Sequence, residues 1–412
     1  MLKTNKLLNF IGIYLFFLST LFFGLYFNED FAGGAKYDFL IHKVAVEAFI
    51  NNFNYAFLNY DQFGNDHSPI YILFLSLLIE NNEMLGRIIY ILISSLLPII
   101  FFLILKTKFK ANNLLLFFLS HLVLLSPYYR AVSIWPGDET ISLILFSCSI
   151  YFYLKFKITN NFQKKLKFLL LNVFSLAITC YFRPVYCIFS IFFFYEFFKN
   201  FNKKLFFYYI ISNLVLSFPA FYYVFYLDVN FFKNAISEFN LINSFTLAYL
   251  TIFFYIIPFI LILKNRIKFF DISYKQIILV LSSSFLVFFM FDYKLSTGGG
   301  FFYYLSKILM NNNLIIYAAF PFAFYLNNIF LKARELPNFI LVFLLVILEI
   351  DGLFYAETYD PLLLILLFSL FKINLESYFF NNMVIKHTKI LSIFVFFVLL
   401  LKITQGHLSL II

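Results

Sequence analysis

The chain has 412 residues, of which 63% are hydrophobic, 24% are aromatic and only 13% are charged, and its mean hydropathy is +0.88. A soluble protein of this length could not bury so much apolar surface, so the composition predicts a membrane protein. In lipid only helices and closed barrels satisfy their own backbone, and the apolar runs here are continuous rather than alternating. We therefore expect an all-α, polytopic membrane protein whose residues 1–412 form a single transmembrane domain.

The net charge of +10 could suggest a nucleic-acid partner, but the distribution of the basic residues favours a topology signal instead. If the N-terminus is inside, 22 of the 31 basic residues and only four of the 21 acidic residues fall in the short inside loops. The positive-inside rule is then met at each cytoplasmic turn. We expect a multi-pass protein of a bacterial inner (plasma) membrane, with a cytoplasmic N-terminus and no nucleic-acid partner.

The pattern of apolar runs predicts about 13 transmembrane helices. The first run follows Lys3 and Lys6 and is longer than the core of a typical signal peptide, so we expect it to be retained as a membrane span. The predicted spans are 7–27, 86–105, 112–127, 138–155, 168–182, 184–198, 205–227, 245–263, 275–291, 314–331, 338–350, 361–372 and 389–403.

The first outer loop, residues 28–87, is the one long polar interruption, and we interpret it as the catalytic loop. It should contain two juxtamembrane helices. The first, over about 38–53, is expected to be amphipathic, with Asp38 and His42 sharing its polar face. The second, over 69–79, would measure about 17 Å and is too short to span; Ser68 is its expected N-cap. Gly33-Gly34 would let the backbone turn tightly after the first span.

The acids of this loop are the candidate catalytic residues. A carboxylate at the membrane surface could take a proton from an acceptor hydroxyl while a phosphate leaves a sugar carbon. Asp38 is our first choice as this general base and Asp30 the second, with His42 orienting Asp38. The alternative interpretation is that Asp38 is a solvated loop acid and that Asp30 caps a helix.

The candidate substrate ligands lie at the ends of predicted spans on the outer side. Arg87, Arg130 and Arg183 stand there against the positive-inside bias, and a guanidinium can clamp the phosphate of a lipid carrier or snorkel to headgroups. Asp138 and Glu139 follow Trp135-Pro136-Gly137, and the alternative to substrate binding is a helix start capped by Asp138. His67 and Tyr71 are further predicted substrate contacts, and Lys36, Lys294 and Lys307 could assist.

The sequence gives little sign of a metal or redox site. The three cysteines lie inside apolar runs and are expected to be unpaired core residues. The histidines show no metal-ligand spacing. No cofactor is expected with certainty, although Asp30, Asp38 and Asp66 could ligate a divalent cation.

The order of these features resembles the GT-C superfamily of integral-membrane glycosyltransferases, which use polyprenyl-phosphate sugars. Ser68-Pro69-Ile70-Tyr71 is similar to the His-Pro-Pro-Leu-Tyr segment of the bacterial protein-mannosyltransferase-like branch. In that branch an acidic residue followed by an arginine precedes the next helix, and the segment 82–87, with Glu83 and Arg87, is similar. The spacing of Asp38 and His42 resembles the first-loop acid of dolichyl-phosphate-glucose glucosyltransferases. The family often has an adjacent Asp-Glu pair in this loop. This chain departs from that pattern, because Glu29-Asp30 precedes the glycine pair and Asp38 stands alone after it.

The resemblance implies transfer of a sugar from a polyprenyl-phosphate donor to a glycan, lipid or protein acceptor on the outer face. Two other classes stay open. A flippase or transporter of lipid-linked glycans would place charged or broken helices near mid-membrane, whereas the acids here lie at one surface. A polysaccharide polymerase or ligase would have its large outer loop late in the chain, whereas here it comes first.

Overall fold

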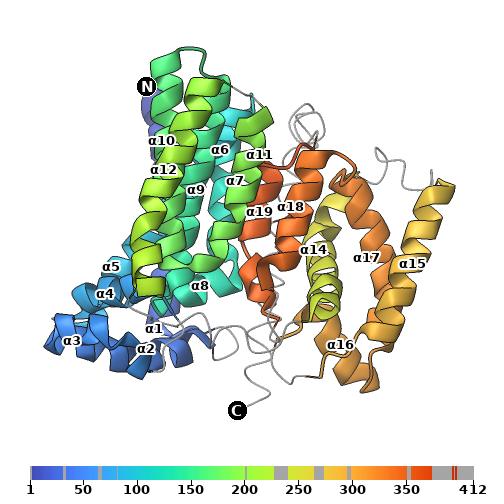
Figure 1. Cartoon of the computed structure of the whole chain (residues 1–412), viewed down its shortest axis with the longest axis horizontal. Coiled ribbons are helices and arrows are strands. Elements are labelled where there is room, and N and C mark those ends of the chain that lie inside the picture. The colour runs from blue at the N-terminus through green and yellow to red at the C-terminus, as the bar shows by residue number, and fades with distance from the viewer. Residues whose placement is uncertain are drawn as a thin grey trace. The chain divides into compact units, whose positions relative to one another are not determined.

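The computed structural model of the chain describes residues 2–30, 34–63, 67–80, 82–199, 202–226, 240–263, 273–294, 298–349, 354–373, 392–393 and 395–396. Every regular element in these ranges is a helix, which confirms the predicted all-α class (Figure 1). Two compact units divide the chain. The first contains the described residues of 1–190, 197–226 and 395–396, and the second contains 191–196 and the described residues of 240–393. The single transmembrane domain stays a prediction.

The first unit contains the outer-loop helices and most of the long apolar helices. Its elements are α1 (Leu2–Tyr26), α2 (Gly34–Asn51), α3 (Phe53–Leu58), η1 (Tyr60–Phe63), α4 (Pro69–Ile79), α5 (Glu83–Ser94), α6 (Leu96–Lys108), α7 (Asn113–His121), η2 (Leu122–Leu125), α8 (Pro127–Ile134), α9 (Asp138–Ile158), α10 (Phe162–Phe182), η3 (Pro184–Phe189), α12 (Lys203–Phe221) and η4 (Tyr222–Tyr226). Helix α11 (Ser190–Lys199) contributes residues to both units.

The second unit is built around α14 (Leu241–Leu263), which contacts five other helices of this unit. Those helices are α15 (Tyr274–Met290), α16 (Gly300–Met310), α17 (Leu314–Phe330), α18 (Leu336–Val346) and α19 (Leu362–Ser369), and the short turns η5 (Ile347–Glu349) and η6 (Ala356–Tyr359) complete the unit. A partly buried ion pair joins Lys372 to Glu196, with Nζ of Lys372 2.9 Å from Oε1 of Glu196.

The described residues of 28–87, the predicted first outer loop, fold as helices where the sequence predicts them. The helix predicted over 38–53 is α2 followed by α3, and the one predicted over 69–79 is α4. The hydroxyl of Ser68 accepts the backbone N–H of Ile70, and Pro69 occupies the first turn of α4, so the expected N-cap is confirmed. Gly33 lies outside the described residues. The juxtamembrane position of these helices stays a prediction.

The predicted faces of α2 need one correction. His42 is only 3% exposed and belongs to the buried face of α2 together with Phe39 and Phe49. Asp38 is exposed. The two residues therefore do not share an exposed polar face. The reason is that the His42 ring packs against the rings of His67 and Tyr71, contacts that the periodicity of the helix alone could not reveal.

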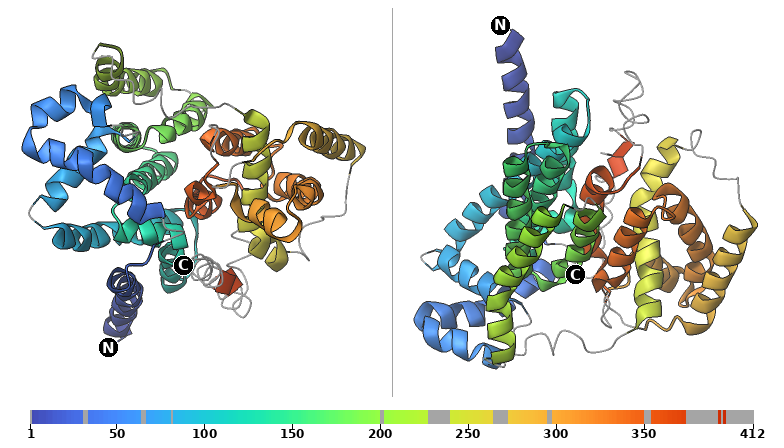
Figure 2. Two further views of the ribbon diagram at one scale, coloured as in Figure 1. Left: turned by 90° about the horizontal axis from the view of Figure 1, so that it is seen from below. Right: turned by 45° about the horizontal axis from the view of Figure 1, so that its top comes forward.

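Helices α9 and α10 form an antiparallel pair that positions the outer-loop residues. They are joined by the short segment 159–161 and contact each other along their length. The start of α9 and the end of α10 therefore meet at the same end of the pair. Helices α2, α3 and α8 lie at one end of this pair, as both Figure 1 and the right-hand view of Figure 2 show. Gly137, rather than the expected Asp138, is the N-cap of α9.

Within the described residues, six helices are long and apolar enough to cross a membrane, so the chain is compatible with a multi-pass membrane protein. They are Leu7–Tyr26, Glu83–Lys108, Asp138–Ile158, Phe162–Phe182, Lys203–Phe221 and Leu241–Leu261. A seventh span is obtained if Asn113–Leu125 and Pro127–Ile134, which are bent by 70°, count as one. Other predicted spans are shorter helices, such as the 17-residue α15 and α17. Most of 389–403 lies outside the described residues, and the number 13 stays a prediction.

Candidate functional site

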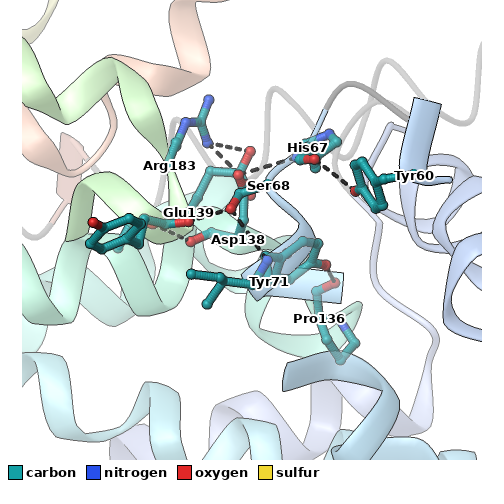
Figure 3. A network of polar contacts seen from close by, with 12 residues as sticks. Tyr60, His67, Ser68, Tyr71, Pro136, Asp138, Glu139 and Arg183 are labelled. Carbon is teal, nitrogen blue, oxygen red and sulfur yellow. Dashed lines mark hydrogen bonds and ion pairs between the residues drawn. The ribbon is translucent and has the colours of Figure 1, made fainter. Parts of the chain in front are cut away.

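Seven of the predicted site residues lie together in the first unit, at the end of α9 and α10. Figure 3 shows His67, Tyr71, Asp138, Glu139 and Arg183. The seven residues come from four segments that are far apart in the sequence. We call this group the Asp138 cluster; its members are Asp38 and His42 of α2, His67 before α4, Tyr71 of α4, Asp138 and Glu139 of α9, and Arg183 after α10.

Asp138 lies at the centre of this cluster. Its Oδ2 atom is 3.1 Å from Nδ1 of His67, and its Oδ1 atom is 3.6 Å from Nη1 of Arg183. Arg183 also forms an ion pair with Glu139, and the hydroxyl of Tyr128 donates a hydrogen bond of 2.8 Å to Oε1 of Glu139. The Asp138 side chain is only 4% exposed. Two carboxylates, one guanidinium and one imidazole therefore form one network of ion pairs around a buried carboxylate, and each charge depends on the others.

The loop before α9 is held in place by hydroxyl groups from α4 and α5. The hydroxyl of Tyr71 donates to the carbonyl of Pro136 at 2.7 Å, and that of Tyr90 donates to the carbonyl of Gly137. A Cβ at Gly137 would lie 2.6 Å from Oε2 of Glu139, so a side chain there would displace the Glu139 carboxylate. The sequence pattern Trp-Pro-Gly-Asp-Glu-Thr thus forms a fixed turn that presents two acids at the start of α9.

The two histidines of the cluster have opposite electrostatic environments. Their ring centroids are 4.3 Å apart. Burial, together with the nearby positive charge of His67, lowers the pKa of His42 to about 3, so His42 is neutral at pH 7. Burial also acts to lower the pKa of His67, but the carboxylate of Asp138 and its hydrogen bond outweigh burial and raise that pKa above 6.5.

Asp38 is the exposed carboxylate at the edge of the cluster. Partial loss of hydration raises its pKa above 3.8, the positive charge of His67 acts to lower it, and Asp138 acts to raise it. Among the residues that the structure describes, Asp38 has no hydrogen-bond or ion-pair partner. Asp38 thus combines access from outside with proximity to a fixed network of charges. This is the arrangement that a proton acceptor for an incoming hydroxyl needs.

Asp30 has a structural partner instead. Its Oδ1 atom accepts the backbone N–H of Lys36 at 3.2 Å, near the start of α2, in the way of a residue that caps a helix. Burial raises its pKa, although the hydrogen bonds from Lys36 and Ala35 act in the other direction. Of the two acids that the sequence nominates, Asp38 is the one whose pKa is shifted by His67, Asp138 and Arg183, while Asp30 accepts a hydrogen bond at the start of α2.

Arg130 lies apart from the cluster and is occupied by another carboxylate. Its Nε and Nη2 atoms donate to the two oxygens of Glu29 at 2.8 and 2.6 Å, and its Nη1 atom donates to the hydroxyl of Thr20 at 2.9 Å. This bidentate pair joins α8 to α1. Arg87 also lies outside the cluster, with its guanidinium over the ring of Trp135. The sequence analysis predicts the same role for all three arginines, but only Arg183 lies in the Asp138 cluster.

Some members of the site were not predicted from the sequence. Tyr90 and Tyr128 hold the loop and the Glu139 carboxylate, yet Tyr90 lies in an otherwise apolar run and Tyr128 is one of two adjacent tyrosines, in a chain that contains 30 of them. Within the described ranges there is no group of three or more His, Cys, Asp or Glu side chains arranged to hold a metal ion. Asp66, one of the three acids suggested for a divalent cation, lies outside the described residues.

Comparison with known proteins gives no independent assignment. No protein-family model matches the chain, and no curated protein or solved structure matches it significantly. The case for a function therefore rests on the residues of the site and on the resemblance of the first outer loop.

Proposed function

We propose that the protein is an inverting glycosyltransferase that moves a sugar from a polyprenyl-phosphate donor to a glycan, lipid or protein acceptor. The observation that carries this proposal is the position of Asp38. It is an exposed carboxylate without a partner among the described residues, within electrostatic range of His67, Arg183 and the buried Asp138. The GT-C resemblance of residues 1–105 supplies the class of donor.

The proposed step is a single displacement in which Asp38 acts as the general base. The hydroxyl oxygen of the acceptor forms a bond to the anomeric carbon, and its proton passes to the carboxylate of Asp38. The bond between the anomeric carbon and the phosphate oxygen breaks, and its electron pair stays on the departing lipid phosphate. Attack opposite the leaving group inverts the configuration at that carbon.

The buried members of the Asp138 cluster act as positioning residues in this proposal. His67 is tied to Asp138, and Arg183 to Asp138 and Glu139, so the charges around Asp38 cannot reorient freely. His42 is neutral and packs its ring against His67 and Tyr71, which fixes α2 against the cluster and so fixes the position of Asp38. We therefore assign the proton transfer to Asp38 and the fixed local field to the ion network.

The ends of the long helices support an outer-face location for this site. The cluster lies where α9 begins and α10 ends, whereas the other ends of these two helices carry Lys155, Lys157, Lys164 and Lys165. Helix α6 likewise ends with Lys106 and Lys108. By the positive-inside rule the lysine ends face the cytoplasm, so the Asp138 cluster would face the periplasm or the cell exterior.

Transfer in membrane vesicles tests the proposal. Radiolabelled polyprenyl-phosphate sugars are supplied to vesicles that contain the wild-type protein or Asp38→Asn. We expect label to move to an acceptor with wild type and not with Asp38→Asn. Glu47→Gln is the matched control, because Glu47 is another exposed acid on α2. If label crosses the bilayer still attached to its lipid and no acceptor is labelled, the protein is a flippase and the proposal is wrong.

A further inference from the structure

Two of the three cysteines lie together at the end of α10. Cys180 is in the last turn of this helix, and Cys187 is in the turn η3, which packs against α10. The two thiols share a hydrogen bond, so their sulfur atoms are already neighbours. Cys148, in contrast, lies in the interior of α9. The expectation that all three cysteines are core residues does not hold for Cys187, which is exposed.

The backbone changes direction between the two cysteines. The N–H of Arg183 donates to the carbonyl of Thr179 at 2.8 Å, and the N–H of Tyr186 donates to the carbonyl of Arg183 at 3.2 Å. Arg183 has an extended backbone, with φ −138° and ψ 100°, and Pro184 follows it at the start of η3. A proline has no N–H with which to continue α10. The chain therefore leaves the helix axis, and η3 brings Cys187 to Cys180.

The exposure of the two side chains suits a reaction with a disulfide. A thiol reacts in this way only where another molecule can reach it, and Cys187 is exposed. Cys180 is partly buried and touches Cys187, so it is in place to attack the sulfur of Cys187 once that sulfur has reacted. The pair lies at the end of α10 for which we propose an outer-face location, and disulfides persist outside the cytoplasm.

The segment between the two cysteines carries the guanidinium of the Asp138 cluster. Nη1 of Arg183 pairs with Glu139 and lies 3.6 Å from Oδ1 of Asp138. The fold holds this segment by local hydrogen bonds and by contacts of single side chains. A covalent bond between Cys180 and Cys187 would close a short loop around Arg183 and restrict the motion of its backbone.

We infer that Cys180 and Cys187 form a dithiol site, which a disulfide oxidant converts into an intramolecular disulfide that restrains the segment carrying Arg183. The oxidant is a small-molecule disulfide or the disulfide of a thiol–disulfide oxidoreductase. This inference goes beyond the proposed function, because the oxidation of the pair does not require sugar transfer.

The reaction proceeds in two exchange steps. Cys187 loses its proton, and its thiolate attacks one sulfur of the oxidant; the S–S bond of the oxidant breaks, and the leaving thiolate takes up a proton. Cys180 then loses its proton and attacks the sulfur of Cys187, which releases the second thiolate of the oxidant to be protonated in turn. The two cysteine thiols are thereby oxidised, and the disulfide of the oxidant is reduced to two thiols.

Thiol counting tests the site. The purified full-length protein in detergent is reduced, freed of reductant and incubated with oxidised and reduced glutathione in varied ratio. It is then quenched with acid, unfolded and labelled with a maleimide. We expect the number of free thiols to fall from three to one as the share of oxidised glutathione rises, with Cys148 still free. Mass spectrometry should show the peptide that contains both Cys180 and Cys187 without two hydrogens and without a glutathione adduct.

Single substitutions separate the roles of the two thiols. Cys180→Ser should accumulate a glutathione adduct on Cys187, because the thiol that displaces the glutathione is missing. Cys187→Ser should form no intramolecular disulfide, and since Cys187 is exposed this variant should fold. Cys148→Ser is the matched control and should form the disulfide as wild type does.

Hydrogen exchange and thermal unfolding test the restraint on the Arg183 segment. In the oxidised protein the backbone amides of 183–186 should exchange at least about threefold more slowly than in the reduced protein. The unfolding temperature should rise by about 2–5 °C on oxidation. Cys187→Ser, treated in the same way, should show neither change.

The inference is wrong if wild type keeps three free thiols at the highest share of oxidised glutathione, if Cys148 enters the disulfide, or if Cys187 stays as a glutathione adduct while Cys180 is present. A disulfide that changes neither the exchange of 183–186 nor the unfolding temperature would also contradict it. Sugar transfer by a protein that fails these tests would leave the proposed function standing, whereas a disulfide in a protein that transfers no sugar would leave the dithiol site standing alone.

Discussion

The Oδ2 atom of Asp138 lies 3.1 Å from Nδ1 of His67, although 71 positions separate the two residues in the sequence. This contact ties the segment before α4, in the first outer loop, to the first residue of α9. Ser68, the next residue, donates its hydroxyl to the carbonyl of Tyr181 near the end of α10. The candidate catalytic loop is thus fixed to the two long helices by adjacent side chains.

Removing the guanidinium of Arg183 should strongly destabilise the protein. Arg183→Met leaves the buried carboxylate of Asp138 and the partly exposed carboxylate of Glu139 with only His67 as a positive partner, and the loss should cost up to about 3–5 kcal/mol, the value for a fully buried pair. Thermal unfolding in detergent measures the effect. Lys294→Gln is the control, because its ion pair with Asp292 is mostly exposed and should contribute less than about 1 kcal/mol. Equal unfolding temperatures for both variants would contradict a buried network at Asp138.

His42 should make the protein less stable in mild acid. Its pKa is about 3 in the folded state and near 6.5 when unfolded, so between these values only the unfolded chain binds the proton. Stability from this residue is present above pH 6.5 and is lost as pH falls, by up to about 1.4 kcal/mol per pH unit. The unfolding temperature of wild type should fall between pH 7 and pH 5. His42→Gln should reduce that slope, and an unchanged slope would count against burial of a neutral His42.

His67 should act in the opposite pH window. Its pKa is raised in the folded state by Asp138, so its stabilising contribution is complete below pH 6.5 and is lost as pH rises through the folded pKa. The unfolding temperature should decline above neutral pH in wild type, and His67→Gln should decline less over the same range. A His67→Gln profile parallel to that of wild type above pH 6.5 would show that the pair with Asp138 carries no pH-dependent stability.

Two glycines of α1 should respond differently to alanine. A Cβ at Gly24 would lie 2.5 Å from both Oε2 of Glu29 and Cδ1 of Ile134, whereas nothing lies within 4 Å of a Cβ at Gly12. Gly24→Ala should therefore cost about 1–3 kcal/mol by overpacking against the Arg130–Glu29 pair. Gly12→Ala should be tolerated. Comparison of the two unfolding temperatures tests the contact of α1 with α8, and equal values would contradict it.

Local signals in the sequence were sufficient for the outer-loop helices and for part of the site. The Ser68-Pro69 pair predicts the start of α4, and the span ends select the residues that the fold brings together at Asp138. Partner choice could not be predicted, because it depends on helix packing across long separations. Arg130 and Arg183 carry the same signal, an arginine at an outer span end, yet one meets Glu29 and the other meets Glu139.

The sequence also could not predict which face of a helix is buried. A histidine at position 42 fits either face of an amphipathic helix, and only the neighbouring rings of His67 and Tyr71 place it inside. The six candidate spans are the long apolar runs with few charges, whereas several of the shorter predicted spans are broken or brief helices whose membrane role apolarity alone does not establish.

The most direct test of the central claim compares three carboxylates in one transfer assay. Asp38→Asn, Asp30→Asn and Glu47→Gln are assayed in vesicles at equal protein amounts and pH 7, with label in the acceptor as the readout. If Asp38 is the general base, the transfer rate of Asp38→Asn should fall about 10²-fold or more. The rate of Glu47→Gln should equal that of wild type. The rate of Asp30→Asn should fall only in proportion to any loss of folded protein. Wild-type transfer by Asp38→Asn, or loss confined to Asp30→Asn, would contradict the assignment of the chemistry to Asp38.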